Sequence, residues 1–372
     1  MIVKSLEAVN FRNYERGNIC FEENTNVIFG NNAQGKTNLL EAIYLFSHGR
    51  SHRAKSDVEL IKFGAEFARL VLEFSDKDRS YRAIFQLAKS GKKSIKINNV
   101  PITKLSMLMR YLNVVMFSPE DLDIVKGAPQ MRRRFLDEAI SQLYPMYLKS
   151  LISYHKNLAQ KNNLLKKLRI SSKQSDEMLS VWNEQIAQDG AKIMKYRRDY
   201  ADKLDSFAAL VHKEMSGEIF KLHYTPSIEC DIISKENFYN KLESAMGREI
   251  ENGSSLYGIQ RDDLRFFIND REVKTYASQG QQRTAVLGMK IAQMEIINEL
   301  RGEYPVLLLD DIMSELDISR RNYLAGKIRG KQVILTCTDA EVVSSADGAK
   351  AFEVKNGEIT VRGEKNVSSS RE

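Results

Sequence analysis

The segment Gly30–Thr37 constrains the fold of this chain more than any other, because it reads G-x-x-x-x-G-K-T. An apolar run, Val27–Phe29, precedes it, and apolar residues at helical spacing follow over residues 37–46. Glycines let such a loop curl so that its N–H groups surround phosphate oxygens, and the positive end of the next helix faces the same anion. The pattern therefore predicts a phosphate-binding loop between a strand and a helix. The expected phosphate contacts are Gly30, Asn31, Asn32, Ala33, Gln34, Gly35, Lys36 and Thr37.

A second apolar run, Val306–Leu309, ends in two acidic residues, Asp310 and Asp311. Such a run is typical of a buried parallel strand, which delivers polar residues at its carboxyl end. We expect Asp310 and the Thr37 hydroxyl to hold Mg²⁺, and Asp311 to orient or deprotonate the attacking water. The alternative is a core strand that ends in a solvated acidic turn. The phosphate-binding loop earlier in the chain favours the metal site.

Three shorter motifs lie between and after these two sites. Ser278–Gln281 begins an amphipathic helix, and taken alone it is a capping box. Ser314–Asp317 follows the acidic strand, and the next strand, residues 333–335, leads into Thr336–Asp339. The order of phosphate loop, signature helix, acidic strand, D-loop and switch strand resembles that of the ABC ATPases.

In that class, two heads enclose two ATP molecules, and the signature of one head covers the γ-phosphate held by the other. A helix N-terminus with a serine hydroxyl is suited to capping an anion. The resemblance therefore implies a homodimer that forms with ATP and separates after hydrolysis. It implies nucleotide contacts at Ser278, Gly280, Gln281 and Asp317 as well as in the loop. The catalytic residues that it implies are Lys36, Asp310, Asp311, Ser278 and Thr338.

The middle of the chain has a different periodicity. From Leu136 to Leu158, and again from Leu179 to Val211, apolar residues recur in steps of three and four, as on one face of a helix. The polar stretch at residues 171–175 separates the two patterns. We expect two long helices in an antiparallel hairpin, inserted between the two halves of an ATPase head as an arm. Two core helices of a bundle would give the same pattern.

An inserted arm of this kind is similar to that of the SMC-like ABC ATPases, and within them the chain resembles the RecF family along nearly its whole length. The motifs that carry the resemblance are Phe11–Tyr14, Gly30–Asn38, Ser51–Arg53, Phe117–Leu122, Arg132–Asp137, Gly258–Leu264 and Leu309–Asp317. The implied fold class is α/β, an ABC-type P-loop ATPase head with an inserted helical hairpin. The expected domains are 1–125 (first lobe), 126–250 (helical lobe and arm), 251–362 (second part of the head) and 363–372 (a flexible tail).

The resemblance also implies a role in recombinational repair, DNA replication and the SOS response. RecF proteins bind double-stranded DNA and single-strand gap junctions as ATP-bound dimers, and act with RecO and RecR to load RecA. The phosphate loop then extends to Asn38, and Arg12 and Asn13 are expected near the adenine or ribose. The chain departs from the ABC pattern at three places. Asp311 stands where glutamate is usual, which suggests slow turnover. No glutamine marks a Q-loop, and Thr338, a poor proton carrier, replaces the switch histidine.

The chain carries 56 Lys and Arg against 49 Asp and Glu, a net charge of +7, which permits nucleic-acid binding without requiring it. The candidate DNA contacts in the head are Arg50, Arg53, Lys55, Lys92 and Lys93; those of the arm are Lys161, Lys166, Lys167 and Arg169, with Arg132–Arg134 at its base. Each cluster has the alternative of a solvated face. Contacts to the DNA backbone would give binding without sequence preference.

Other classes fit the sequence less well. The three cysteines lie far apart, no apolar run approaches the length of a membrane span, and the N-terminus lacks a signal-peptide pattern. We therefore expect a cytoplasmic protein with no membrane partner. A tether of the SMC type would need a longer arm with an apolar hinge. A nuclease of the overcoming-lysogenization type would need a further acidic metal-binding domain after Thr338, and a transporter motor would not carry the arm at this place.

Overall fold

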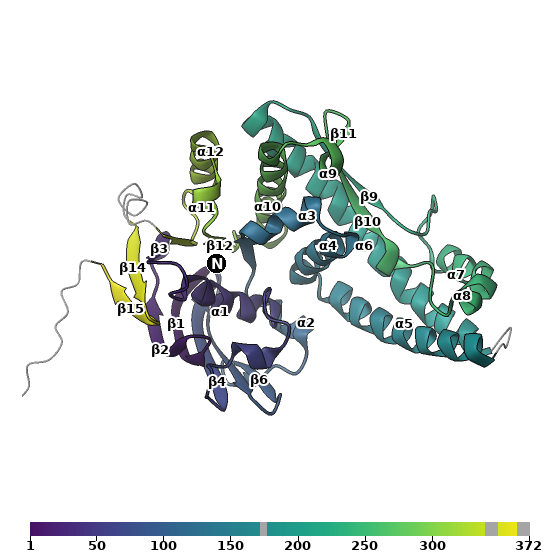
Figure 1. Cartoon of the computed structure of the whole chain (residues 1–372), viewed down its shortest axis with the longest axis horizontal. Helices are drawn as coiled ribbons and strands as arrows, with labels where there is room; N and C mark the ends of the chain where they lie inside the picture. Colours follow the sequence, from purple (N-terminus) through teal and green to yellow (C-terminus); the bar gives the residue numbers. More distant parts are fainter. Residues whose placement is uncertain (172–176, 339–348, 363–372) are drawn as a thin grey trace, which may run out of the picture. The chain divides into compact units, whose positions relative to one another are not determined.

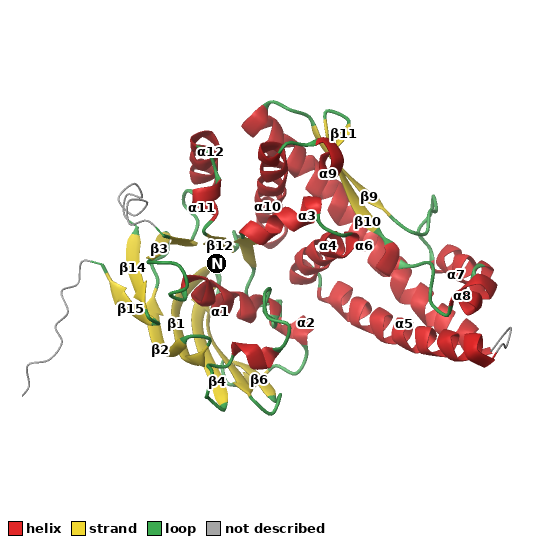
Figure 2. Cartoon of the chain, in the orientation of Figure 1, coloured by secondary structure: helices red, strands yellow, loops and turns green. Residues whose placement is uncertain are grey.

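The computed structural model describes residues 1–171, 177–338 and 349–362. The chain divides into two compact units: residues 1–120 with 297–372, called the head unit, and residues 121–296, called the arm unit. Figure 1 follows the chain through both, and Figure 2 marks the helices and strands. The predicted tail, 363–372, lies outside the described residues.

One sheet of the head unit is antiparallel. Its strands, in spatial order, are β2 (Tyr14–Cys20), β1 (Ile2–Phe11), β4 (Phe67–Ser75), β5 (Ser80–Ala88), β6 (Lys93–Ile97) and β7 (Val100–Pro101). Leu70, Leu72 and Phe74 alternate with more exposed residues along β4 and join the core, as expected for a sheet with one covered face.

The other sheet of the head unit is mainly parallel and holds the predicted functional motifs at its strand ends. Its strands, in order, are β15 (Glu358–Val361), β14 (Lys350–Lys355), β3 (Thr25–Phe29), β13 (Val333–Cys337), β12 (Val306–Asp310) and β8 (Val114–Phe117). Only the β14–β15 pair is antiparallel. Strands β12 and β13 are buried throughout, which explains their unbroken apolar sequences.

Helix α1 (Lys36–His48) contacts strands of both sheets, and its apolar residues belong to the same core as theirs. Because nearly all of its residues are buried, its sequence is apolar on more than one face. The shorter helices of this unit are α2 (Leu105–Leu108), α11 (Ile312–Glu315), α12 (Ile318–Ile328) and two 3-10 turns, Asp57–Leu60 and Pro119–Leu122.

The arm unit contains the predicted hairpin, in which α5 (Pro145–Ser171) and α6 (Glu177–Ser216) run side by side in opposite directions (Figure 1). The helical pattern that starts at Leu136 is not one helix, because α4 (Pro129–Leu143) ends before Pro145, whose ring cannot continue a helix. The polar break at residues 171–175 falls almost wholly outside the described residues.

The hairpin is also not bare, since further elements of the unit pack on it. Helix α7 (Lys235–Ser244) packs on α6, and α8 (Met246–Asn252) packs on α5. A three-stranded antiparallel sheet, β11 (Arg271–Glu272), β10 (Asp263–Ile268) and β9 (Phe220–Thr225), contacts α6 through β9. The remaining elements are α3 (Asp123–Lys126), the 3-10 turn Ile259–Arg261, α9 (Val273–Tyr276) and α10 (Gln279–Arg301).

The two units divide the chain at different positions from the domains that the sequence suggests. Residues 251–296, assigned from sequence to the second part of the head, group with the arm unit. The reason is that β10 pairs with β9, which follows α6 directly. Among the described residues, no helix is both long enough and apolar enough to cross a membrane.

Candidate nucleotide site

The phosphate-binding loop has the backbone that its glycines predict. Gly30 and Gly35 have φ values of 147° and 111°, and Ala33 has 64°, so the loop is left-handed at three points before α1 begins at Lys36. A Cβ on Gly30 would lie 2.4 Å from the carbonyl oxygen of Val354 in β14. The first glycine is therefore required by the close approach of a neighbouring strand as well as by its dihedral angle.

Two residues of the β1–β2 turn support this loop. The Asn13 side chain donates from Nδ2 to the Gln34 carbonyl at 2.7 Å and accepts from Asn38 Nδ2 at 2.8 Å. The Tyr14 hydroxyl donates to the Gly35 carbonyl at 3.0 Å. Sequence reasoning identified the motif Phe11–Tyr14 but assigned no support of the loop to these two side chains. Their contact with it depends on pairing between distant segments, which no local signal reveals.

The Lys36 ammonium lies against the backbone of the phosphate-binding loop. Its ammonium donates to the carbonyls of Gly30 and Asn31, at 2.6 and 2.9 Å. Burial lowers the pKa of Lys36, and the nearby Asp311 opposes this shift. The charge is thus held by two neutral carbonyl groups, which a phosphate group can replace as partners.

Asp310, at the end of β12, joins three elements through one carboxylate oxygen. Its Oδ1 accepts from Thr37 Oγ1 at 2.8 Å and from Thr336 Oγ1 at 2.7 Å. Burial raises the pKa of Asp310, and these two hydrogen bonds offset the shift only in part. Thr336 was missed from sequence. It lies two residues before Thr338, which is exposed immediately after β13.

Asp311 has an unusual backbone and an unsatisfied side chain. Its φ is 49°, and its N–H donates to Thr336 Oγ1 at 3.0 Å. Its Oδ1 is buried and has no hydrogen-bond partner among the described residues. A buried carboxylate oxygen without a donor is costly unless a ligand, ion or water satisfies it.

These oxygens fit the Mg²⁺ that the loop sequence implies. Magnesium prefers one or two carboxylates, waters and the substrate's phosphates over an all-protein cage. Thr37 and Asp310 provide a hydroxyl and a carboxylate side by side. No group of three acidic, cysteine or histidine side chains able to hold a metal occurs in the described part of the chain, which agrees with a site of this sparse kind.

Arg12, expected near the adenine or ribose, is engaged with Glu41 of α1. Its Nε and Nη2 donate to the Glu41 carboxylate at 2.8 and 2.7 Å, and its Nη1 donates to the Glu59 carbonyl at 3.0 Å. Ser51 Oγ donates to the same carboxylate. Burial alone would raise the pKa of Glu41, but the bonds from Arg12 and Ser51 outweigh it and hold the pKa below its usual value.

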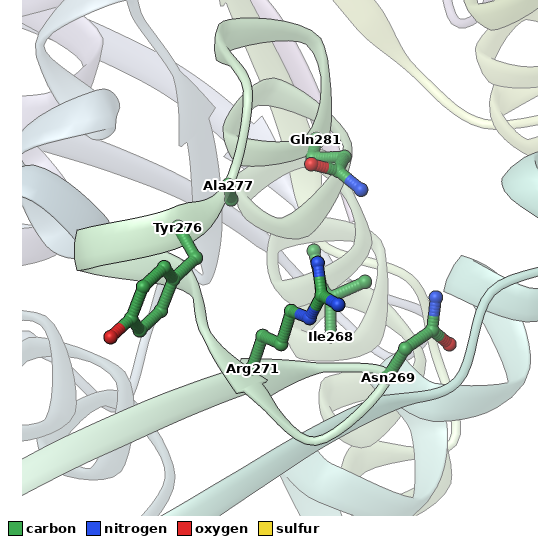
Figure 3. Close-up of a pocket in the computed structure, with 6 residues that line it drawn as sticks. All are labelled: Ile268, Asn269, Arg271, Tyr276, Ala277 and Gln281. Atoms are coloured by element: carbon green, nitrogen blue, oxygen red, sulfur yellow. The ribbon is translucent and has the colours of Figure 1, made fainter.

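In the arm unit, the signature segment closes the N-terminus of α10. The Ser278 N–H donates to Gln281 Oε1 at 2.9 Å, and the Gln281 N–H donates to Ser278 Oγ at 3.3 Å, which is a capping box. A pocket of about 370 Å³ lies beside it (Figure 3). Its lining residues are Ile268, Asn269, Arg271, Tyr276, Ala277 and Gln281. In the head unit, Asp317 caps α12 by accepting from the Arg320 N–H at 3.0 Å.

The candidate DNA contacts of the head are all exposed, but one of them also makes structural contacts. Arg50, Arg53, Lys55, Lys92 and Lys93 are in the exposed class. Lys93 starts β6 and is not in the turn itself; its ammonium donates to the Gly49 carbonyl at 2.5 Å and pairs with Asp57 at 2.9 Å. These residues stay predictions, with Lys93 already partly committed to structural contacts.

In the arm unit, two predicted DNA contacts are wrong. Lys161 is 1% exposed and pairs with the equally buried Glu249 at 2.6 Å. Arg132 is 4% exposed and donates to both oxygens of Asp263, at 2.6 and 2.9 Å. Basic residues on a buried helix face are structural when an acidic residue from another segment pairs with them. The periodicity of a helix identifies its buried face but does not reveal this partner.

Arg197 of α6 is the centre of a buried charge cluster that the sequence did not suggest. Its Nη1 donates to Asp262 at 2.9 Å and to the Ile259 carbonyl at 2.8 Å, and its Nη2 donates to Asp137 at 2.8 Å. The motifs Arg132–Asp137 and Gly258–Leu264 meet here. Their role in this structure is to join α4, α6 and β10.

The phosphate loop, the acidic strand beside it and the order of the remaining motifs define an ATPase head of the ABC type. A family model described as RecF/RecN/SMC N terminal domain matches residues 2–360. A protein of Bacillus cereus strain G9842 described as DNA replication and repair protein RecF is 42% identical over 369 residues, covering 96% of this chain and 98% of that protein. The chain therefore belongs to the RecF family.

Further relatives agree with this placement. A RecF of Bacillus anthracis strain CDC 684 is 41% identical, with the same coverage. A solved structure of the recombination mediator protein RecF in the RecFOR pathway, described as RecF-ATPrS, has a TM-score of 0.91 at 34% identity and covers 97% of this chain and 98% of that one. An Smc head domain of Pyrococcus furiosus has a TM-score of 0.57 at 18% identity, covering 96% and 95%, and shares the fold.

Proposed function

We propose that this protein is an ATP-gated DNA-binding protein of recombinational repair, present in the cytoplasm. The observation that best supports ATP use is the position of the Asp310 carboxylate, which accepts hydrogen bonds from the Thr37 and Thr336 hydroxyls. It lies at the carboxyl ends of the parallel strands, where the phosphate loop also begins. One solved relative, at 34% identity, is described as RecF-ATPrS, and another is described as RecF-ATP.

The chain's own residues have distinct tasks in this proposal. The loop N–H groups and Lys36 bind the phosphates, while Thr37 and Asp310 hold Mg²⁺. When bound, MgATP supplies the phosphoryl group and the positive charge that stabilises its transfer. Asp311 orients the attacking water and accepts its proton at the buried Oδ1. Hydrolysis is slow, because aspartate is shorter than the usual glutamate and Thr338 is a poor proton carrier.

We place the ATP-bound state in a homodimer. Ser278, Gly280 and Gln281 of one copy, with Asp317, contact the nucleotide on the loop of the other, and hydrolysis separates the copies. The dimer binds double-stranded and gapped DNA through backbone contacts, without sequence preference. DNA weakly stimulates the ATPase activity.

The proposed pathway follows from the relatives' descriptions, which include DNA replication and repair and the RecFOR pathway. In this proposal the protein acts with RecO and RecR at single-strand gaps, promotes RecA loading, and contributes to DNA replication and the SOS response.

The test is analytical sedimentation of wild type and Lys36→Met, with and without MgATP, and with and without duplex DNA at two salt concentrations. Wild type should dimerise with ATP and bind DNA, whereas Lys36→Met should stay monomeric. Each DNA phosphate contact should add about 0.9 to the slope of log affinity against log salt. Lys221→Met removes a half-exposed lysine of the arm unit and serves as the control. A wild type that stays monomeric with ATP and does not bind DNA would refute the proposal.

A further inference from the structure

The β1–β2 turn has two sets of contacts that lead to different parts of the head unit. Asn13 and Tyr14 hold the phosphate loop through the carbonyls of Gln34 and Gly35. Arg12, one residue earlier, donates instead to the Glu41 carboxylate and to the Glu59 carbonyl. Its φ of 51° is uncommon for a residue with a side chain, so the turn is held in a conformation that its contacts must stabilise.

The contacts of Arg12 fix both ends of residues 51–60. We call these residues the basic segment after its two candidate DNA contacts, Arg53 and Lys55, although it also contains Asp57 and Glu59. At its start, the Glu41 carboxylate that Arg12 pairs with accepts from Ser51 Oγ. Ser51 Oγ in turn accepts from the N–H groups of Arg53 and Ala54, at 2.9 and 2.8 Å. The start of the segment is therefore organised around one hydroxyl whose proton is directed at Glu41.

At the other end, Arg12 holds the segment through its backbone. Its Nη1 donates to the Glu59 carbonyl at 3.0 Å, and its own N–H donates to the Leu60 carbonyl at 2.8 Å. Lys55 and Arg53, the candidate DNA contacts of the segment, lie between these two attachment points and are exposed.

Because Glu41 is buried, its carboxylate depends on its hydrogen-bond donors. Its side chain is completely inaccessible to solvent, whereas that of Arg12 keeps 21% of its exposure. An ionised carboxylate in such a place needs its hydrogen-bond donors, and Arg12 and Ser51 both donate to it. Removing either donor weakens the hold on the basic segment without touching the phosphate loop.

We infer that Arg12 and Glu41 are positioning residues for the basic segment, and that Arg12 acts on DNA binding through Glu41 and Ser51 and does not bind the nucleotide. The inference rests on the proposed DNA-binding role of Arg53 and Lys55. It assigns adjacent residues of one turn to separate tasks: Arg12 to the basic segment, and Asn13 to the phosphate loop.

The test compares Arg12→Lys, Ser51→Ala and Asn13→Ala in the full chain, with Ser51→Thr as the matched control that keeps the hydroxyl. Three quantities are measured: affinity for a fluorescent ATP analogue, hydrogen exchange of the amides of residues 51–61, and ATP-dependent binding of duplex DNA. Circular dichroism confirms that each variant is folded.

We expect Arg12→Lys and Ser51→Ala to speed exchange of the Arg53 and Ala54 amides and to weaken DNA binding, each by about tenfold, because a hydrogen bond to a charged group is lost. ATP affinity should stay within about twofold of wild type. This change is much smaller than the one that losing one such hydrogen bond to ATP would cause. Asn13→Ala should lower ATP affinity and leave the exchange of the Arg53 and Ala54 amides unchanged, and its DNA binding should return to the wild-type level at saturating ATP. Ser51→Thr should match wild type.

A loss of ATP affinity in Arg12→Lys with unchanged exchange would overturn the inference and return Arg12 to the nucleotide. Unchanged exchange in both Arg12→Lys and Ser51→Ala would also overturn it. If wild type does not bind DNA, the proposed function fails, but the exchange and ATP measurements still decide whether Arg12 positions the basic segment or binds the nucleotide.

Discussion

The nucleotide site of the head unit and the arginine cluster of the arm unit both bury charge, but they satisfy it in opposite ways. Asp310 accepts from two neutral hydroxyls, and Lys36 donates to two neutral carbonyls. Arg197, by contrast, is matched by two carboxylates from different elements. Neutral partners leave a charge available to a ligand, whereas opposite charges in direct contact complete each other. The comparison distinguishes a site that can bind a ligand from a charge cluster that holds secondary-structure elements together.

The largest expected effect is that of Arg197→Met. The substitution leaves Asp137 and Asp262 in place without their cation, and breaking a buried pair in this way costs about 3–5 kcal/mol of unfolding free energy. The chain has one tryptophan, Trp182, on α6, so its fluorescence during urea unfolding reports on the arm unit.

The control for Arg197→Met is Lys221→Met, which removes a half-exposed lysine paired with Asp270 at 3.3 Å. Its effect should stay below about 1 kcal/mol, as for surface pairs in general. Equal urea midpoints for the two variants would show that the arginine cluster does not hold the arm unit together.

A somewhat smaller effect is expected for Lys161→Met, which leaves the buried Glu249 without its cation at a cost of about 3 kcal/mol. Adding Glu249→Gln should restore more than half of this, because the amide oxygen still accepts from Ser255 and Leu256 while the charge is gone. Urea unfolding followed at Trp182 measures both variants. A double variant no more stable than the single one would contradict the pairing argument.

The smallest effect, and one of opposite sign, is expected for Asp310→Asn. The pKa of Asp310 is raised in the folded protein, so between its unfolded value, about 3.9, and the higher folded value the folded chain binds more protons than the unfolded one. The contribution of this carboxylate to stability therefore falls as pH rises through that interval.

At neutral pH, Asp310→Asn should thus raise the free energy of unfolding, while ATP hydrolysis is lost. Hydrogen exchange of β12 at pH 4 and pH 7 measures the change, and the gain over wild type should be larger at pH 7. A variant less stable than wild type at pH 7 would place Asp310 with the structural charges of the arm unit.

The sequence predicts the contiguous motifs of the nucleotide site but not the contacts between distant segments. The loop at Gly30–Thr37 and the acidic strand could be located because a few contiguous residues carry the whole pattern. The partners Thr336, Asn13 and Glu41 could not, since each joins the site through strand pairing or through helix α1 against a distant segment. Lys161 was misassigned for a related reason: its sequence neighbours Lys166 and Lys167 are exposed, and only the fold brings Glu249 to it.

The position of β3 in its sheet has a consequence for synthesis of the chain. This strand leads into the phosphate loop, yet its two neighbours, β13 and β14, come from the opposite end of the sequence, and Gly30 rests against Val354. The phosphate-loop motif therefore leaves the ribosome long before the strands that complete its surroundings, and such non-local pairing is slow to form. A nascent chain lacking β14 should be unable to bind ATP, so nucleotide binding reports that β3 has paired with both of its neighbours.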